Sequence, residues 1–149
     1  MEKIISLILV IYLVWFVFKF IMLIVTNITA LNAFYKVEQL LNKRYEIIAS
    51  ILAKSNNDNE EIAKYLEELK NLPKGKKFLN RKLALNYVLT SMLPENIESD
   101  EYRVVTLELK TLGDIYNHKA DKLKVCTEVF PASFYARFLR IKPLDYYRG

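Results

Sequence analysis

The first part of the chain is a predominantly apolar run from Ile4 to Val25, in which Lys19 is the one charged side chain. A helix rises about 1.5 Å per residue, so this run would extend about 33 Å. Because the hydrocarbon core of a bilayer is about 30 Å thick, the pattern predicts a transmembrane helix over residues 4–25. A secretory signal peptide would have small residues at a cleavage site, whereas this run continues through bulky side chains. We therefore favour an uncleaved anchor over a cleaved leader.

Downstream of this run, apolar residues recur at three- and four-residue spacing, which is the spacing of one helix face. The first series comprises Leu31, Phe34, Val37, Leu41, Ile48, Ile51 and Leu52. This series predicts that the membrane helix continues to about Ala53, so that its second half forms one wall of a soluble domain. The polar residues between Thr26 and Thr29 leave open a bend or hinge between the two halves.

Turn residues and helix caps divide the rest of the chain into further helices. In chain order, the sequence predicts four further helices. They are a helix capped by Asp58 or Asn59 that ends before Pro73, a helix over residues 76–93, a helix that begins near Ser99 and Asp100 and ends at Pro131, and a short helix over residues 134–141 capped by Ser133. The fourth helix has the most regular apolar pattern, which is typical of a long helix packed along a partner at a shallow angle. We therefore predict an all-α fold, in which a single N-terminal transmembrane helix continues into an antiparallel helical bundle of three to four helices over residues 26–149.

The composition agrees with helices and offers little chemistry. Glycine (3) and proline (4) are scarce, and the 149 residues leave room for one modest domain after the anchor. The single cysteine, Cys126, excludes an intrachain disulfide, and its place in the apolar pattern indicates a buried side chain rather than a nucleophile. The single histidine lacks the neighbours of a metal site, and adjacent carboxylates such as Glu60 and Glu61 diverge around a helix. We therefore expect no catalytic residues, metal, cofactor or enzyme activity.

The formal net charge of +5 is concentrated near the C-terminus, where residues 118–149 contain seven basic and three acidic residues. On a membrane protein this predicts contact with the bilayer and its anionic headgroups rather than with nucleic acid. The expected membrane-surface contacts are Lys19, Arg137, Arg140, Lys142 and Arg148. Lys19 either extends its stem toward the headgroups or is a functional charge within the membrane, and we favour the first interpretation. The basic cluster between Lys74 and Lys82 is either a headgroup-binding patch or a solvated helix start.

Basic residues also indicate the orientation of the anchor. Lys3 precedes it, whereas Lys36, Lys43 and Arg44 follow it. Cytoplasmic flanks of membrane helices carry an excess of lysine and arginine. We therefore expect a cell-membrane protein with its N-terminus outside and its helical domain in the cytoplasm.

The chain ends in a series of residues with a characteristic order and spacing, namely Tyr116, Asn117, Phe130, Pro131, Ala136, Lys142, Pro143, Tyr146 and Tyr147. A second characteristic segment, AFYKVEQLLNKRYEII from Ala33 to Ile48, follows the anchor. In both segments the chain resembles the LemA family, as a shortened and divergent member. Phe34 stands where that family usually has tryptophan, and Ala49 stands where it usually has proline.

The resemblance implies structural roles for the nine C-terminal residues and a single-pass bacterial membrane protein with a helical cytoplasmic bundle. The molecular activity of that family is not established. We therefore expect a membrane-anchored helical scaffold or interaction protein that binds protein partners or self-associates. The alternative is a small accessory subunit that docks on a larger membrane protein complex. In either case, we expect Phe130, Pro131 and Tyr146 to hold the last segment against the bundle.

Overall fold

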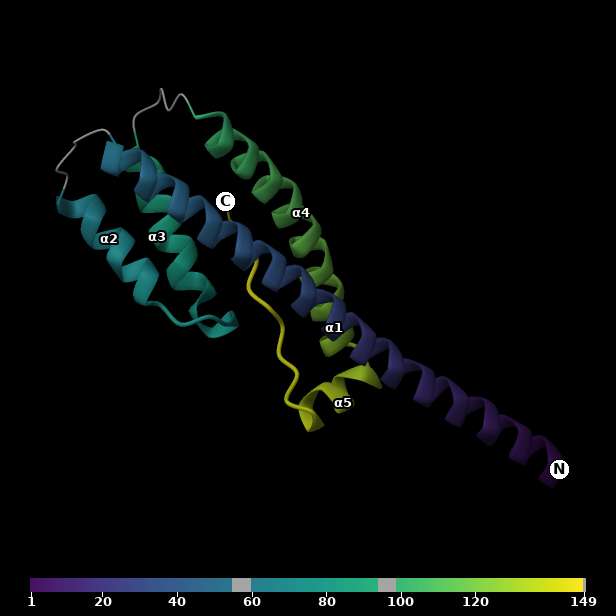
Figure 1. The fold of residues 1–149 in the computed structure, drawn as a ribbon. Coiled ribbons are helices and arrows are strands. Elements are labelled where there is room, and N and C mark those ends of the chain that lie inside the picture. The colour runs from purple at the N-terminus through teal and green to yellow at the C-terminus, as the bar shows by residue number, and fades with distance from the viewer. Residues whose placement is uncertain (55–59, 94–98, 149) are drawn as a thin grey trace. The chain divides into compact units, whose positions relative to one another are not determined.

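The computed structural model describes residues 1–54, 60–93 and 99–148, and every regular element in these ranges is a helix (Figure 1). The elements are α1 (Glu2–Lys54), α2 (Glu60–Asn71), the 3-10 helix η1 (Lys76–Phe78), α3 (Leu79–Met92), α4 (Asp100–Glu128) and α5 (Ala132–Phe138). The predicted all-α class is confirmed. The prediction that the helix of the apolar run continues to about Ala53 is also confirmed, because α1 extends to Lys54. The chain is helical throughout residues 26–29, where the sequence left a bend or hinge open.

The chain divides into two compact units. The first, here called the anchor unit, contains residues 1–31 and 118–144, and the second, the core unit, contains residues 32–117 and 145–149. Both α1 and α4 contribute residues to each unit, because the division falls within these two helices.

In the core unit, α3 and α4 contact the second part of α1, and α2 contacts α3 (Figure 1). Contacts of α1 with α3 occur in the same chain order along both helices, so these two run parallel, whereas contacts with α4 occur in reverse order. The pairs are Glu38 with Lys82 and Arg44 with Thr90 for α3, and Phe34 with Tyr116 and Arg44 with Tyr102 for α4. The apolar face of α1 predicted from the spacing is buried here, including Phe34, Val37, Leu41 and Ile48.

In the anchor unit, α1 is bare along its first part and packed along its second. Every residue from Met1 to Trp15 is exposed, whereas Leu23 and Ala30 are fully buried. Other apolar residues of this unit are also buried, including Ala120, Leu123, Ala132, Ala136 and Leu144. Several of these are alanines, and their small side chains allow the backbones of neighbouring segments to approach closely. The apolar face of the last part of α4 is therefore buried within this unit.

Two helix starts differ from the sequence predictions. The third predicted helix begins with the single turn η1 before α3, and the last helix begins at Ala132, so Ser133 lies inside α5 and does not cap it. The predicted start of α4 near Ser99 and Asp100 is confirmed, and the Ser99 hydroxyl oxygen caps this start by accepting a hydrogen bond from the Tyr102 backbone N–H at 3.3 Å. The predicted cap at Asp58 or Asn59 lies outside the described residues.

Candidate functional site in the core unit

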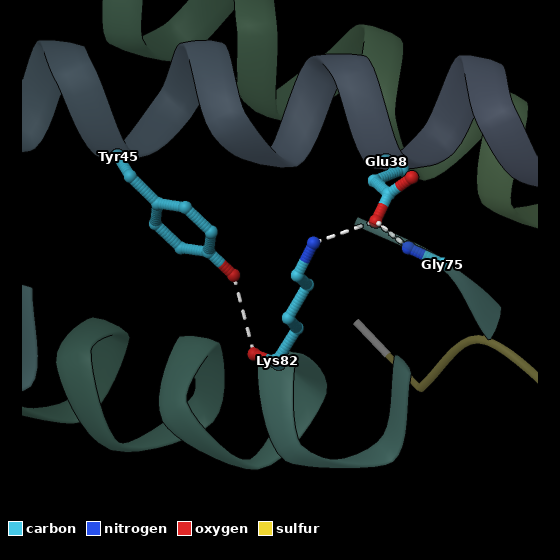
Figure 2. A network of polar contacts seen from close by, with 4 residues as sticks. All are labelled: Glu38, Tyr45, Gly75 and Lys82. Carbon is cyan, nitrogen blue, oxygen red and sulfur yellow. Dashed lines mark hydrogen bonds and ion pairs between the residues drawn. The ribbon is translucent and has the colours of Figure 1, made fainter. Parts of the chain in front are cut away.

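A buried ion pair joins α1 to α3. The Lys82 Nζ atom lies 2.6 Å from Glu38 Oε1, and the two side chains are 2% and 5% exposed. The same carboxylate oxygen accepts a hydrogen bond from the backbone N–H of Gly75 at 3.0 Å, and the Tyr45 hydroxyl donates to the Lys82 backbone carbonyl at 3.2 Å. Figure 2 shows Glu38 and Tyr45 reaching from α1 to α3, with Lys82 extending back toward the carboxylate. The pair therefore fixes the position of α3 along α1.

Gly75 has a backbone conformation that favours glycine. Its φ of +133° lies in a region that residues with a side chain rarely adopt. This conformation lies between the end of α2 and the start of η1, where the N–H of Gly75 donates to Glu38. Substitution of this glycine would therefore disturb both the turn and the buried carboxylate.

Arg44 is a second buried charge on α1, with 5% of its surface exposed. Its Nη2 atom donates to the Tyr102 hydroxyl at 2.8 Å and to the Thr90 hydroxyl at 3.2 Å, and its guanidinium carbon lies 5.1 Å from the centre of the Tyr102 ring. None of the described residues places a carboxylate oxygen within 4.0 Å of it. Arg44 is thus held by neutral partners, in contrast to Lys82.

A cavity of about 660 Å³ opens beside Arg44. Its lining comes from α1, α3, α4 and the C-terminal residues, namely Arg44, Asn86, Tyr87, Thr90, Thr106, Leu107, Lys110, Asp114, Tyr147 and Arg148. Three polar atoms of these residues are buried and have no hydrogen-bond partner among the described residues: Arg44 Nε, Asn86 Oδ1 and Thr106 Oγ1. Buried polar groups without a partner are rare in native proteins, because each costs about 1–3 kcal/mol.

The C-terminal residues are held on the core unit by α4. The Tyr116 hydroxyl donates to the Asp145 backbone carbonyl at 2.5 Å, and the Asn117 amide exchanges two hydrogen bonds with the backbone of Tyr147, at 2.6 and 2.9 Å. The Tyr147 ring lies directly on Gly113, where a Cβ atom would overlap it. These contacts bring Tyr147 and its neighbour Arg148 to the cavity beside Arg44.

Burial shifts the titration of three tyrosines in this unit. Desolvation raises the pKa of Tyr45 and of Tyr116 well above the ordinary 10.0, and the nearby charge of Asp145 adds to the effect at Tyr116. Desolvation also raises the pKa of Tyr147, although the positive charge of Arg44 opposes that shift. Below pH 10 these phenols are therefore neutral and able to donate hydrogen bonds.

The residues of the LemA-like C-terminal pattern are divided between the two units. Tyr116, Asn117, Tyr146 and Tyr147 belong to the core unit, and Phe130, Pro131, Ala136, Lys142 and Pro143 belong to the anchor unit. The residues expected to hold the last segment differ in burial. Tyr147 is the buried member of the aromatic pair, whereas Tyr146 is 36% exposed, and Phe130 is 60% exposed while Pro131 is buried.

The expected membrane-surface residues are divided in the same way. Arg137, Arg140 and Lys142 are exposed in the anchor unit, where Lys19 is half-buried, whereas Arg148 lines the cavity of the core unit. The predicted basic cluster between Lys74 and Lys82 is also corrected, because Lys82 is buried against Glu38 and Arg81 pairs with Glu68. Lys74, Lys76 and Lys77 remain exposed.

Sequence reasoning missed the roles of Glu38, Arg44 and Lys82. One signal was available for the first two: both lie within the apolar face of α1, close to Val37, Leu41 and Ile48, where a charge requires a partner. No family model, curated protein or solved structure matches the chain, so the LemA resemblance stays a prediction.

Proposed function

We propose that this chain is a single-pass, membrane-anchored helical scaffold or interaction protein of the LemA type. The observation that carries the proposal is the two-part character of α1, whose first part is apolar and bare and whose second part is built into the core unit. A helix that is apolar on all sides is stable only when a protein core or lipid surrounds it. No described protein segment surrounds residues 4–15, so lipid is the environment that suits them.

The length of the bare segment supports a position of α5 at the membrane. The twelve residues from Ile4 to Trp15 reach about 18 Å, which is less than the hydrocarbon thickness of about 30 Å. The remaining depth must come from residues 16–25, and α5 packs on this stretch. The ring of Tyr135 lies 4.9 Å, between centroids, from both Phe16 and Phe20, and its hydroxyl reaches the Phe16 carbonyl at 3.4 Å.

The exposed side chains around α5 suit a lipid interface. Phe130, Phe134 and Phe138 are 60%, 60% and 80% exposed. Exposed arginine and lysine accompany them at Arg137, Arg140 and Lys142. Aromatic rings that enter the acyl region, with long basic side chains that reach the headgroups, are typical of interfacial membrane segments. In this proposal, the basic residues of α5 and the segment after it contact anionic lipids.

For the rest of the chain, we propose that the core unit is an antiparallel four-helix bundle in the cytoplasm and that the N-terminus is outside. The reversed direction of α1 and α4 supports the bundle, and the exposed Lys36 and Lys43 beyond the anchor support the orientation. The polar groups of the core unit would serve structure and recognition rather than catalysis. Protein partners or a second copy of the chain would bind to its surface.

An accessory subunit docked on a larger complex is the second candidate. It is favoured by exposed apolar residues on α4, namely Val104, Leu107 and Ile115. The exposed polar residues Glu108 and Thr111 interrupt this stripe, which weakens it as a docking surface. Crosslinking in native membranes followed by mass measurement separates the candidates. A self-associated species supports the scaffold, and a fixed stoichiometric complex with one larger membrane protein supports the accessory subunit.

The membrane proposal is tested by labelling single cysteines in a Cys126→Ser background. A membrane-impermeant maleimide should label Lys3→Cys in intact cells, and it should label Glu61→Cys only after permeabilisation. The opposite pattern would show that the orientation is wrong. If alkaline carbonate releases the chain from isolated membranes, or if the mass of the mature protein shows that the apolar run has been removed, α1 is not a membrane anchor.

The position of α5 needs a separate measurement. Trp15 is the only tryptophan, so Trp15→Phe with Phe134→Trp places a single fluorophore on α5. In vesicles, brominated acyl chains should quench this tryptophan, and aqueous iodide should not. Strong quenching by iodide alone would place α5 in water and remove this part of the proposal.

A further inference from the structure

We propose that the cavity beside Arg44 binds the phosphate group of a small organic phosphate monoester. Nothing in the scaffold function requires such a site. It rests on three features of the core unit: a buried guanidinium with no acidic partner among the described residues, unpartnered polar atoms on residues that line the cavity, and an excess of positive charge among the described lining residues.

Arg44 provides the central charge. A guanidinium stays charged in a protein, and a buried charge costs several kcal/mol unless an opposite charge and hydrogen bonds compensate it. Lys82 illustrates the compensated case in this same unit, because the Glu38 carboxylate lies 2.6 Å from it. Within residues 1–54, 60–93 and 99–148, the partners of the Arg44 guanidinium are the hydroxyls of Thr90 and Tyr102 and the ring of Tyr102. An oxyanion in the cavity would provide the compensation that the described residues do not.

The unpartnered atoms identify the kind of group that fits. Arg44 Nε is a donor, and the Thr106 hydroxyl can donate as well as accept. The third atom, Asn86 Oδ1, belongs to an amide that offers either its oxygen or its NH₂ group after rotation of the amide plane. Arg44, Asn86 and Thr106 all line the cavity, and donors of these kinds match an acceptor-only group with several oxygens, as in phosphate.

The lining charges favour a doubly charged group. Lys110 and Arg148 add two positive charges to that of Arg44, and among the described residues of the lining only Asp114 is acidic. A phosphate monoester carries close to two negative charges at neutral pH, whereas a carboxylate carries one. The cationic residues at the exposed edge would also attract such an anion from solution.

The size of the cavity favours an organic ester over the free ion. Its volume of about 660 Å³ lies in the range of sites for small organic ligands. The side chains of Tyr87, Leu107 and Tyr147 form the apolar part of the lining, and they would contact the organic group. The phosphate could belong to a soluble metabolite or to a lipid with a phosphomonoester headgroup, and the two sources are separated by experiment.

The full chain is purified in a maltoside detergent and titrated by calorimetry with phenyl phosphate, short-chain phosphatidic acid and short-chain phosphatidylcholine. We expect saturable binding of at least one of the first two and none of phosphatidylcholine. Stronger binding of phenyl phosphate identifies a soluble ligand, and stronger binding of phosphatidic acid identifies a lipid. Absence of saturable binding for both phosphomonoesters overturns the proposal.

Variants test the assigned atoms. Arg44→Gln should weaken binding by about tenfold or more, and Arg81→Gln, an exposed arginine outside the cavity, should leave it unchanged. Thr106→Val keeps the shape of the side chain, so this variant tests the proposed binding site if Arg44→Gln does not fold. This variant should weaken binding by about threefold to tenfold, while the ligand-free protein melts at a higher temperature because a buried unpartnered hydroxyl has been removed. Unchanged affinity in Arg44→Gln, or in Thr106→Val where only that variant folds, overturns the assignment.

Discussion

Removing one charge of the Glu38–Lys82 pair should be far more harmful than removing both. Glu38→Gln keeps the side-chain shape and an acceptor for Gly75, and Lys82→Met keeps the aliphatic stem. Each single variant leaves one buried charge without its partner. The double variant Glu38→Gln with Lys82→Met leaves no unpaired charge, and only part of the glutamine amide stays unsatisfied.

The expected magnitudes follow from the distance and burial of the pair. At 2.6 Å and an effective dielectric constant of about 20, the attraction is about 6 kcal/mol. Desolvation of two side chains that are 2% and 5% exposed cancels most of this gain. We therefore expect each single variant to lower the free energy of unfolding by about 3–5 kcal/mol and the double variant by only about 1–3 kcal/mol. The coupling energy would be several kcal/mol.

The assay is thermal melting of the full chain in detergent, combined with hydrogen exchange of the amides of α3. Exchange reports the opening of the element that carries Lys82, separately from the exposed apolar part of α1. The matched control is Glu68→Gln, because Glu68 forms an ion pair of 2.5 Å with Arg81 whose side chains are 35% and 57% exposed. Water screens this pair, so its loss should cost less than about 1 kcal/mol.

Two results would refute this reasoning. If the single variants lose no more than the Glu68→Gln control, the buried pair does not fix α3 on α1. If the double variant loses the sum of the two single losses to within about 0.5 kcal/mol, the two charges are not coupled.

Two further predictions concern the tyrosines and the C-terminal residues. Because burial raises the pKa of Tyr45 and Tyr116, the folded chain keeps protons that the unfolded chain releases above pH 10.0, so the contribution of these two phenols to stability should be constant below that pH and fall above it. The loss should approach about 1.4 kcal/mol per pH unit for Tyr45, and melting curves of Tyr45→Phe with Tyr116→Phe should show a smaller decline than the parent chain; an equal decline would contradict the assignment. Gly113→Ala should lower stability by about 1–3 kcal/mol because the new methyl group overlaps the Tyr147 ring, although glycine to alanine usually stabilises an exposed helix by about 1 kcal/mol. Thermal melting shows whether Gly113→Ala lowers or raises stability. In a Tyr147→Ala background, where the ring is absent, Gly113→Ala should cause no further loss of stability.

Lys82 and Tyr147 show where local sequence patterns are insufficient. Lys82 lies among basic residues and was expected to be a surface charge, because nothing near it in sequence indicates that Glu38 lies opposite. Tyr146 and Tyr147 are adjacent aromatic residues, and only the close approach to Gly113 and the hydrogen bonds with Asn117 decide that Tyr147 is buried. Phe130 continues the apolar period of α4, yet its side chain is exposed beyond the end of that helix.

The helical class, the extension of α1 beyond the apolar run and the start of α4 near Ser99 follow from the sequence, because apolar period and residue type act within one or two turns of a chain. Which polar residues meet depends instead on the packing of helices that lie far apart in the sequence. The buried ion pair joins residues 44 positions apart, and the Arg44 hydrogen bonds span 46 and 58 positions. Such contacts depend on how helices pack, and a period along one helix does not specify the helix opposite. The cavity beside Arg44 exists for the same reason, since its lining comes from three helices and the C-terminal residues.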